Sequence, residues 1–428
     1  MNSRSLIHWA NVEERRRKQH GTGLQSRSGV AMSVLLGLLL TGEMTRRLLM
    51  AKDEGTTIAA VLGASQLWIA VAVCGYAIGV FGAPFRLYWR RDSKLLASLP
   101  VPGASLFALA VWRSQRVALL VSLALCLALV PLGVLVDWQL ATRHVLVLVV
   151  GFAGSAWLGP AAALSAGAIV ASDKAQAMIA SMSGEFQAPR TSWLGIMPGL
   201  AATAVAVAVI SCAPWVVGGR PPGGSALLIA GLGVGVPAAL VGWAWTRADR
   251  VIPAAVREVA ALDQEILAHI DKSTPSWLER RFFGVLLPSS RLLAVKDASM
   301  LRRRYPSPYF MIPVGIAVLW IVAAIQPDRY LPWGGALYGG LLVYAMVMAR
   351  RTWVSPVEIP QLLRALPLSP KQVARAKNLQ AILRILMVGV FGGAPIVFRA
   401  PDLASTGIFV VLGALVSVSL SARFTPSE

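Results

Sequence analysis

Two segments of the chain combine an acidic residue with the same spacing of leucine and proline. The first leucine segment (residues 92–100) contains Asp92, Leu95, Leu96, Leu99 and Pro100, and the second (residues 358–367) contains Glu358, Leu362, Leu363, Leu366 and Pro367. Positions i, i+1 and i+4 of a helix share a face, so the three leucines of each segment form an apolar patch. The proline disfavours helical geometry at the residue before it, which ends the helix there. The chemistry that this spacing favours is docking of a short helix on a partner.

The surroundings of the two segments are also alike. In both copies an apolar run ends in two arginines, the leucine segment follows, and another apolar run comes after it. The second copy has its own helix start, because Ser355 can cap, Pro356 suits the first helical position and Glu358 lies three residues after the cap. A further start of this kind follows at Ser369, with Gln372 three residues later. The pattern predicts an internal repeat of two short helices lying under a membrane.

Residues that could carry catalysis, metal binding or nucleotide binding are sparse. The four histidines are scattered singly, and the three cysteines lie inside apolar runs: His8, His20, His144, His269, Cys74, Cys126 and Cys212. We expect no disulfide framework, metal site or cofactor, and we expect His144 and His269 at an interface or the surface. No Gly-Lys dipeptide occurs, so the chain lacks a phosphate-binding P-loop. The sequence therefore predicts no enzyme, and energy for directional work has to come from a partner.

The composition predicts an all-α, polytopic membrane helix bundle. The 428 residues are 56% hydrophobic and 14% charged, with a mean hydropathy of +0.64, whereas soluble domains carry about 25% charged residues. A hydrocarbon core requires about 20 apolar residues for each helix. About ten spans are expected, at 29–50, 57–82, 117–136, 144–171, 193–217, 225–245, 309–325, 331–349, 378–398 and 404–421.

Charge predicts the orientation and the organisation of these spans. Most of the 40 Lys and Arg residues fall in alternate connecting segments, which predicts that both termini lie in the cytoplasm. The expected location of this multi-pass chain is a bacterial cytoplasmic (inner) membrane. This topology accounts for the net charge of +20 without a nucleic-acid partner. The spans form two unequal repeats. The predicted parts are a basic segment 1–28, a first half of about six spans 29–245, a helical cytoplasmic linker 246–308 and a second half of about four spans 309–428.

The linker and the spans carry further local patterns. An amphipathic helix is expected from Pro253 to Lys272, and another from Trp277 to Leu287. Most spans have no ionisable residue in their middles, which argues against proton relays. Small residues spaced four apart, as at Gly75 and Gly79, favour close packing within one bundle.

The order of arginines, acidic residue, leucine segment and basic helix resembles the type-two ATP-binding-cassette exporter permeases. A second likeness is Lys296 and Asp297 followed by Arg302, Arg303 and Arg304, which is similar to the segment before the first span of such permeases. The resemblance implies that the two leucine segments are coupling helices that seat in a separate ATPase subunit. The importer signature ending in Ile-x-Leu-Pro is absent, which favours export. The second half looks two spans short of a full pseudo-dimer.

Three functions remain open on the sequence. The first is a permease subunit that couples hydrolysis in a separate ATP-binding-cassette ATPase to export, alone or with a second copy or a paralogous permease. The second is a non-transporting membrane scaffold or assembly protein. The third is a secondary transporter driven by an ion gradient, which would show flux without ATP.

Overall fold

The computed structural model describes residues 24–53, 57–89, 101–173, 193–217, 224–268, 277–286, 288–304, 306–325, 337–342 and 369–399, with a few single positions between them. Within these ranges almost all residues are helical and no strand occurs. The chain divides into two compact units, the first formed by residues 1–184 and 193–256, and the second by residues 185–192 and 257–428.

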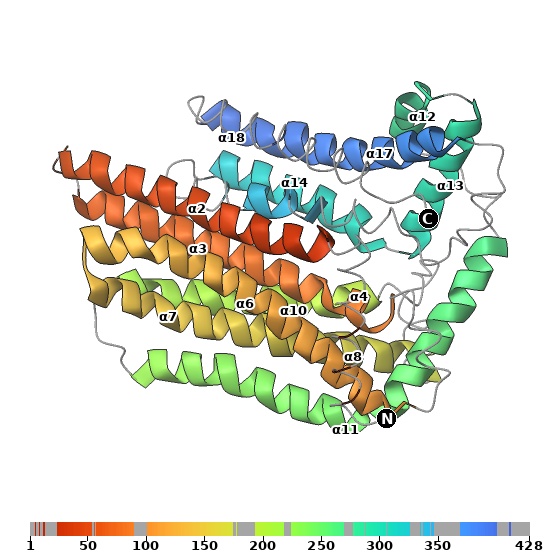
Figure 1. Ribbon diagram of the computed structural model, residues 1–428, viewed down its shortest axis with the longest axis horizontal. Helices are drawn as coiled ribbons and strands as arrows, with labels where there is room; N and C mark the ends of the chain where they lie inside the picture. Colours follow the sequence, from red (N-terminus) through yellow and green to blue (C-terminus); the bar gives the residue numbers. More distant parts are fainter. Residues whose placement is uncertain are drawn as a thin grey trace. The chain divides into compact units, whose positions relative to one another are not determined.

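Long helices that pack side by side build most of the first unit (Figure 1). Its helices are α2 (Leu24–Asp53), α3 (Thr57–Phe81), α4 (Ala83–Leu87), α6 (Gly103–Leu135), α7 (Trp138–Ala153), α8 (Gly159–Val170), α10 (Trp193–Val217) and most of α11 (Gly224–Ala268). A π-helical turn, η1 (Gly154–Leu158), joins α7 and α8 into one continuous rod. A π-turn inserts one residue into an α-helix and shifts the faces on either side of it.

Small residues allow these helices to pack closely. Helix α10 packs against α3, α7 and α8, and α2 packs against α6. A Cβ atom on Gly75 of α3 would lie 2.8 Å from a methyl group of Val121 on α6, and one on Gly79 would meet the hydroxyl of Ser155 in η1. The expectation that this glycine pair serves packing within one bundle is confirmed, because both glycines face other helices of the same unit.

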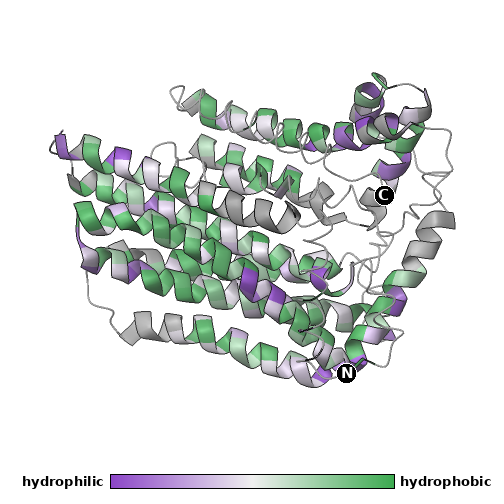
Figure 2. Cartoon of the chain, in the orientation of Figure 1, coloured by the Kyte–Doolittle hydropathy of each residue, from purple (hydrophilic) through white to green (hydrophobic). Residues whose placement is uncertain are grey.

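Five helical segments among the described residues are long and apolar enough to cross a membrane. They are Ala60–Leu87, Gly103–Leu135, Trp138–Val170, Trp193–Cys212 and Arg375–Phe398. Figure 2 shows apolar residues along most of their length. The chain is thus an all-α helical protein with several candidate membrane helices, while the number of ten spans and the cytoplasmic termini stay predictions.

The second unit pairs a small helical cluster with apolar helices. Its described helices are α12 (Trp277–Phe283), α13 (Pro288–Arg304), α14 (Pro306–Ile325), α17 (Pro370–Met387) and α18 (Gly393–Arg399), with the π-turn η4 (Val388–Gly392) between the last two. Helices α12, α13 and α17 enclose a hydrophobic core of Phe283, Leu293, Ala294, Ala298, Ala376 and Leu383. Helix α14 packs against η4 and α18.

Two predicted linker helices differ from the structure at their ends. The expected helix from Pro253 is not separate, because α11 runs without a break from Gly224 to Ala268 and contains Pro237 and Pro253 in its interior. Val256 and Val259, three positions apart in this part of α11, are buried. Helix α12 begins at Trp277 as expected but ends at Phe283, four residues before Leu287.

Candidate functional site

The ten residues predicted to couple the chain to an ATPase lie outside the described residues. Asp92, Leu95, Leu96, Leu99 and Pro100 fall within positions 90–100, and Glu358, Leu362, Leu363, Leu366 and Pro367 fall within positions 346–368. Their helical form, like their docking role, stays a prediction. The residues before and after the first segment and those after the second segment are described, and they form the candidate site.

The residues before the first leucine segment are firmly packed. Tyr88 and Trp89, which follow α4, are buried, and the Trp89 ring lies 4.8 Å from that of Phe85. The Tyr88 hydroxyl lies so close to Gly167 of α8 that a Cβ atom at this position would collide with it. Burial raises the pKa of Tyr88 above its ordinary value, so the phenol stays neutral. The backbone immediately before the first leucine segment is therefore held in place by buried side chains.

The residues after the first leucine segment are fixed by α11. The first four N–H groups of a helix have no partner within the helix, and Pro102, at the N-cap of α6, has no side chain that can accept from them. Asp249 of α11 replaces the missing cap, since its Oδ1 accepts a hydrogen bond of 2.8 Å from the Ala104 N–H. Gly103 permits this approach, because a Cβ atom there would collide with the Ala248 carbonyl group.

The second leucine segment ends immediately before a well-formed helix start. The Ser369 side chain accepts from the Gln372 N–H, and the Gln372 side chain accepts from the Ser369 N–H at 2.8 Å, which together form a capping box. This confirms the helix start predicted at Ser369. Helix α17 then continues through η4 into α18, so the residues after the segment belong to a rod that includes a candidate membrane helix.

Helix α17 is joined to α13 by a buried polar contact. The Nζ atom of Lys377 lies 3.8 Å from Oδ2 of Asp297, and the Nζ atom of Lys296 lies 3.4 Å from Oδ1 of the same carboxylate. Gln380 of α17 donates a hydrogen bond to the Ala294 carbonyl. Lys296 and Asp297 are among the residues that the family resemblance singled out, and Lys377, 80 positions after Asp297, is a partner of that carboxylate.

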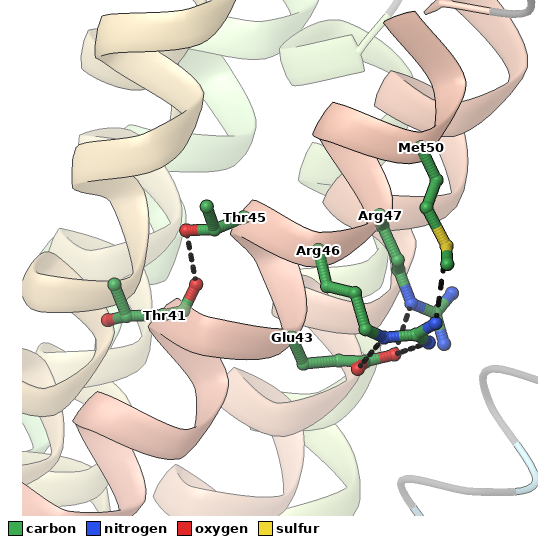
Figure 3. A network of polar contacts seen from close by, with 6 residues as sticks. All are labelled: Thr41, Glu43, Thr45, Arg46, Arg47 and Met50. Carbon is green, nitrogen blue, oxygen red and sulfur yellow. Dashed lines mark hydrogen bonds and ion pairs between the residues drawn. The ribbon is translucent and has the colours of Figure 1, made fainter. Parts of the chain in front are cut away.

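Helix α2 carries a network of charged side chains near the end of the first predicted span of the chain. The Glu43 carboxylate accepts hydrogen bonds from Arg46 and Arg47 at 2.8 to 2.9 Å, and one Arg46 N–H group also points to the Met50 sulfur (Figure 3). All contacts join residues three or four positions apart on one helix. The network neutralises Glu43 locally, and its contacts among the described residues all lie within α2.

The expectation for His144 is wrong. His144 is fully buried in α7, where its ring makes an edge contact with Trp68 of α3 at a centroid distance of 4.9 Å. Its Nδ1 lies 2.8 Å from the Leu140 carbonyl oxygen. Because a carbonyl oxygen only accepts, Nδ1 carries a proton. Nε2 is buried without a hydrogen-bond partner among the described residues. His269 lies outside those residues.

The π-turn in the second unit has polar partners that the sequence did not indicate. Trp320 of α14 donates from Nε1 to the Phe391 carbonyl at 3.0 Å, and the Tyr338 hydroxyl donates to the Gly389 carbonyl at 3.3 Å. A π-turn interrupts the regular α-helical hydrogen-bond ladder, and here side chains donate additional hydrogen bonds to two of its carbonyl groups. Gly392 and Gly393 were the available signal in the sequence, because they leave room for the Tyr338 side chain, which lies 3.1 to 3.4 Å from the positions that their Cβ atoms would take.

The described residues contain no group of three or more His, Cys, Asp or Glu that could hold a metal ion. Cys74, Cys126 and Cys212 are free thiols. No matching family model, curated protein or solved structure was found for the chain. The fold itself defines a class: a multi-pass, all-α protein with helices suited to a membrane, whose second unit contains a small helical cluster with its own hydrophobic core.

Proposed function

We propose that this chain is the transmembrane permease subunit of an ATP-driven exporter of the ATP-binding-cassette class, and that a separate ATPase docks on its two leucine segments. Hydrolysis in the partner would then move substrate outward through the helical bundle. The observation that carries the proposal is the anchoring at the borders of both segments. Residues that precede or follow each segment are held by buried side chains or by a completed helix cap.

Such anchoring matters because a partner that pushes on a short helix can move the rest of the protein only if the residues on either side of that helix are held rigidly. At the first segment, the Tyr88 contact with α8 and the Asp249 contact with α6 connect the flanks to long apolar helices. At the second, α17 leads directly into the helix that ends at Arg399. A partner that closes on both segments would thereby shift membrane helices, which is how rigid-body alternating access operates.

Co-purification tests the proposal. Affinity-tagged full-length chain is extracted from its native membrane in mild detergent, and the captured proteins are identified by mass spectrometry. We expect an ATPase subunit with a P-loop, and we expect the quadruple variant with aspartate at Leu95, Leu96, Leu362 and Leu363 to lose it. The matched control replaces the same four leucines with methionine, which keeps an apolar face of similar volume.

The outcome decides between the functions that the sequence left open. Capture of the ATPase by wild type and by the aspartate variant alike would remove the coupling role of the leucines. Capture of other membrane proteins without any ATPase would favour the scaffold. A cysteine at Ser93 that reacts only with impermeant reagents added outside the cell would also contradict docking of a cytoplasmic partner.

One observation favours the gradient-driven carrier as a second candidate. His144 is an ionisable side chain buried in a helix of membrane-spanning length, and such residues mark proton or ion pathways by default. In a carrier of this kind, His144→Gln would abolish flux that depends on a proton gradient. In the permease, His144→Gln would leave ATP-dependent activity of the partner in place.

A further inference from the structure

The short helix α12 separates its residues sharply into a buried and an exposed face. Glu279 and Phe283, four positions apart, are buried, and Phe283 belongs to the core shared with α13 and α17. Trp277, Arg280 and Arg281 follow the spacing i, i+3 and i+4, so they share the opposite face. All three are exposed, with Trp277 at 69%.

Helix α13 shows the same separation. Its residues Leu293, Ala294, Asp297 and Ala298 are buried against α17. Arg291 and Leu292 lie on the outer side of its first turns, where Leu292 is 73% exposed. Val285, in the turn that joins the two helices, is 85% exposed. An apolar side chain therefore lies on the outside of α12, of the turn and of α13.

Charge follows the same division. Both acidic residues of this hairpin, Glu279 and Asp297, are buried, whereas Arg280, Arg281 and Arg291 are exposed. Figure 2 shows hydrophilic residues gathered on these two helices. The outer surface of the hairpin thus combines three arginines with three large apolar side chains, and the described part of it exposes no carboxylate.

The hairpin leads directly into an apolar helix. Helix α13 ends at Arg304, α14 begins at Pro306, and the two helices are in contact. Helix α14 has 20 residues, the length that a hydrocarbon core requires. Tryptophan, arginine and aliphatic side chains on one face are the composition of helices that lie in the interface of an anionic bilayer.

We propose that the outer surface of the hairpin, formed by Trp277, Arg280, Arg281, Val285, Arg291 and Leu292, docks on the anionic phospholipid headgroups of the membrane. The arginines bind the phosphate groups, while the three apolar side chains enter the boundary between headgroups and acyl chains. Docking covers apolar surface that water would otherwise contact. This inference does not depend on an ATPase partner.

Fluorescence of a single probe tests the proposal on the full-length chain. The native cysteines Cys74, Cys126 and Cys212 are replaced by alanine, and Leu292→Cys carries an environment-sensitive fluorophore. The protein is placed in nanodiscs of pure phosphatidylcholine, or of phosphatidylcholine with one third phosphatidylglycerol. We expect the emission to shift to shorter wavelength only in the anionic nanodiscs, and high salt to reverse the shift.

The variants separate lipid docking from folding. Each arginine near an anionic surface favours the bound state by about fivefold. Replacement of Arg280, Arg281 and Arg291 with glutamine should therefore lower the ratio of docked to undocked hairpin by about a hundredfold. The control Arg375→Gln removes an exposed arginine from α17 and should leave the shift intact. Retained exchange protection of α13 shows that the triple variant is folded.

Three outcomes would overturn the proposal. One is emission typical of water in both lipid compositions, which would mean that the surface stays solvated. A second is a shift that appears only after a cytoplasmic protein fraction is added, which would assign the surface to a protein partner. An unchanged shift in the triple arginine variant would count against headgroup recognition in the same way.

Discussion

Lys377 and Asp297 form an ion pair of 3.8 Å between α17 and α13, and both side chains are about 95% buried. The carboxylate has a second cation, Lys296, whose side chain is 30% exposed. Removing one partner of a buried pair leaves an uncompensated charge, which is more costly than removing both. The two partners are unequal here, because only Asp297 is shared between two lysines.

Asp297→Asn should therefore destabilise the α13 and α17 contact by about 3–5 kcal/mol, since it leaves Lys377 buried without this carboxylate. Lys377→Met should cost less, because Asp297 keeps Lys296 as a partner. The double variant should be more stable than Asp297→Asn alone. Hydrogen exchange of α13 and α17 measures this order. Equal loss of protection in both single variants would contradict the shared role of Asp297.

Asp249→Ala should weaken the start of α6 by about 1 kcal/mol, because the Ala104 N–H loses the acceptor that replaces a cap. Asp249→Asn should keep most of the stability of this helix start, since an amide oxygen also accepts a hydrogen bond. Hydrogen exchange of residues 103–107 is the measurement. If alanine and asparagine give the same protection as wild type, the contact does not hold the end of the first leucine segment.

Gly167→Ala should destabilise the first unit by about 1–3 kcal/mol, because the new methyl group meets the Tyr88 ring, with Cζ at 2.7 Å. Tyr88→Phe should restore part of the loss by removing the hydroxyl. Thermal unfolding in detergent compares the variants. The matched control is Gly242→Ala, which has open space around its Cβ position and should be neutral or slightly stabilising.

Trp320→Phe should destabilise the packing of α14 on η4 by about 1 kcal/mol, the typical value for a hydrogen bond between membrane helices. A phenylalanine at position 320 can keep the ring contact with Phe398, which is at 6.3 Å. The interaction that is lost is therefore the hydrogen bond to the Phe391 carbonyl. Proteolysis of the detergent-solubilised chain at increasing temperature compares the two. An unchanged cleavage profile would show that another donor serves this carbonyl.

Local features were predictable where a few neighbouring residues decide the structure. The capping box at Ser369 and Gln372 involves four consecutive positions, and it forms as expected. The start of α12 at Trp277 was also correct. The sequence did not predict where α12 ends or that α11 continues through Pro253. Tertiary packing determines whether a helix continues beyond a weak local signal.

Site residues were harder to foresee when their partners lie far along the chain. Nothing near Asp249 indicates that it completes the start of a helix 145 positions earlier. His144 was expected at an interface or the surface because the histidines are scattered singly along the chain, whereas in the fold it contacts the Leu140 carbonyl oxygen and Trp68 of another helix.

The sequence alone determined that this is an all-α protein with candidate membrane helices. In lipid, an apolar run of about 20 residues satisfies its own backbone hydrogen bonds by forming a helix. It also located the leucine segments and several helix starts. Only the tertiary structure decided which charges are buried, which helix caps are supplied from a distance and which face of the α12 and α13 hairpin stays outside. These properties depend on contacts between helices, and a one-dimensional pattern does not specify which side chains meet in space.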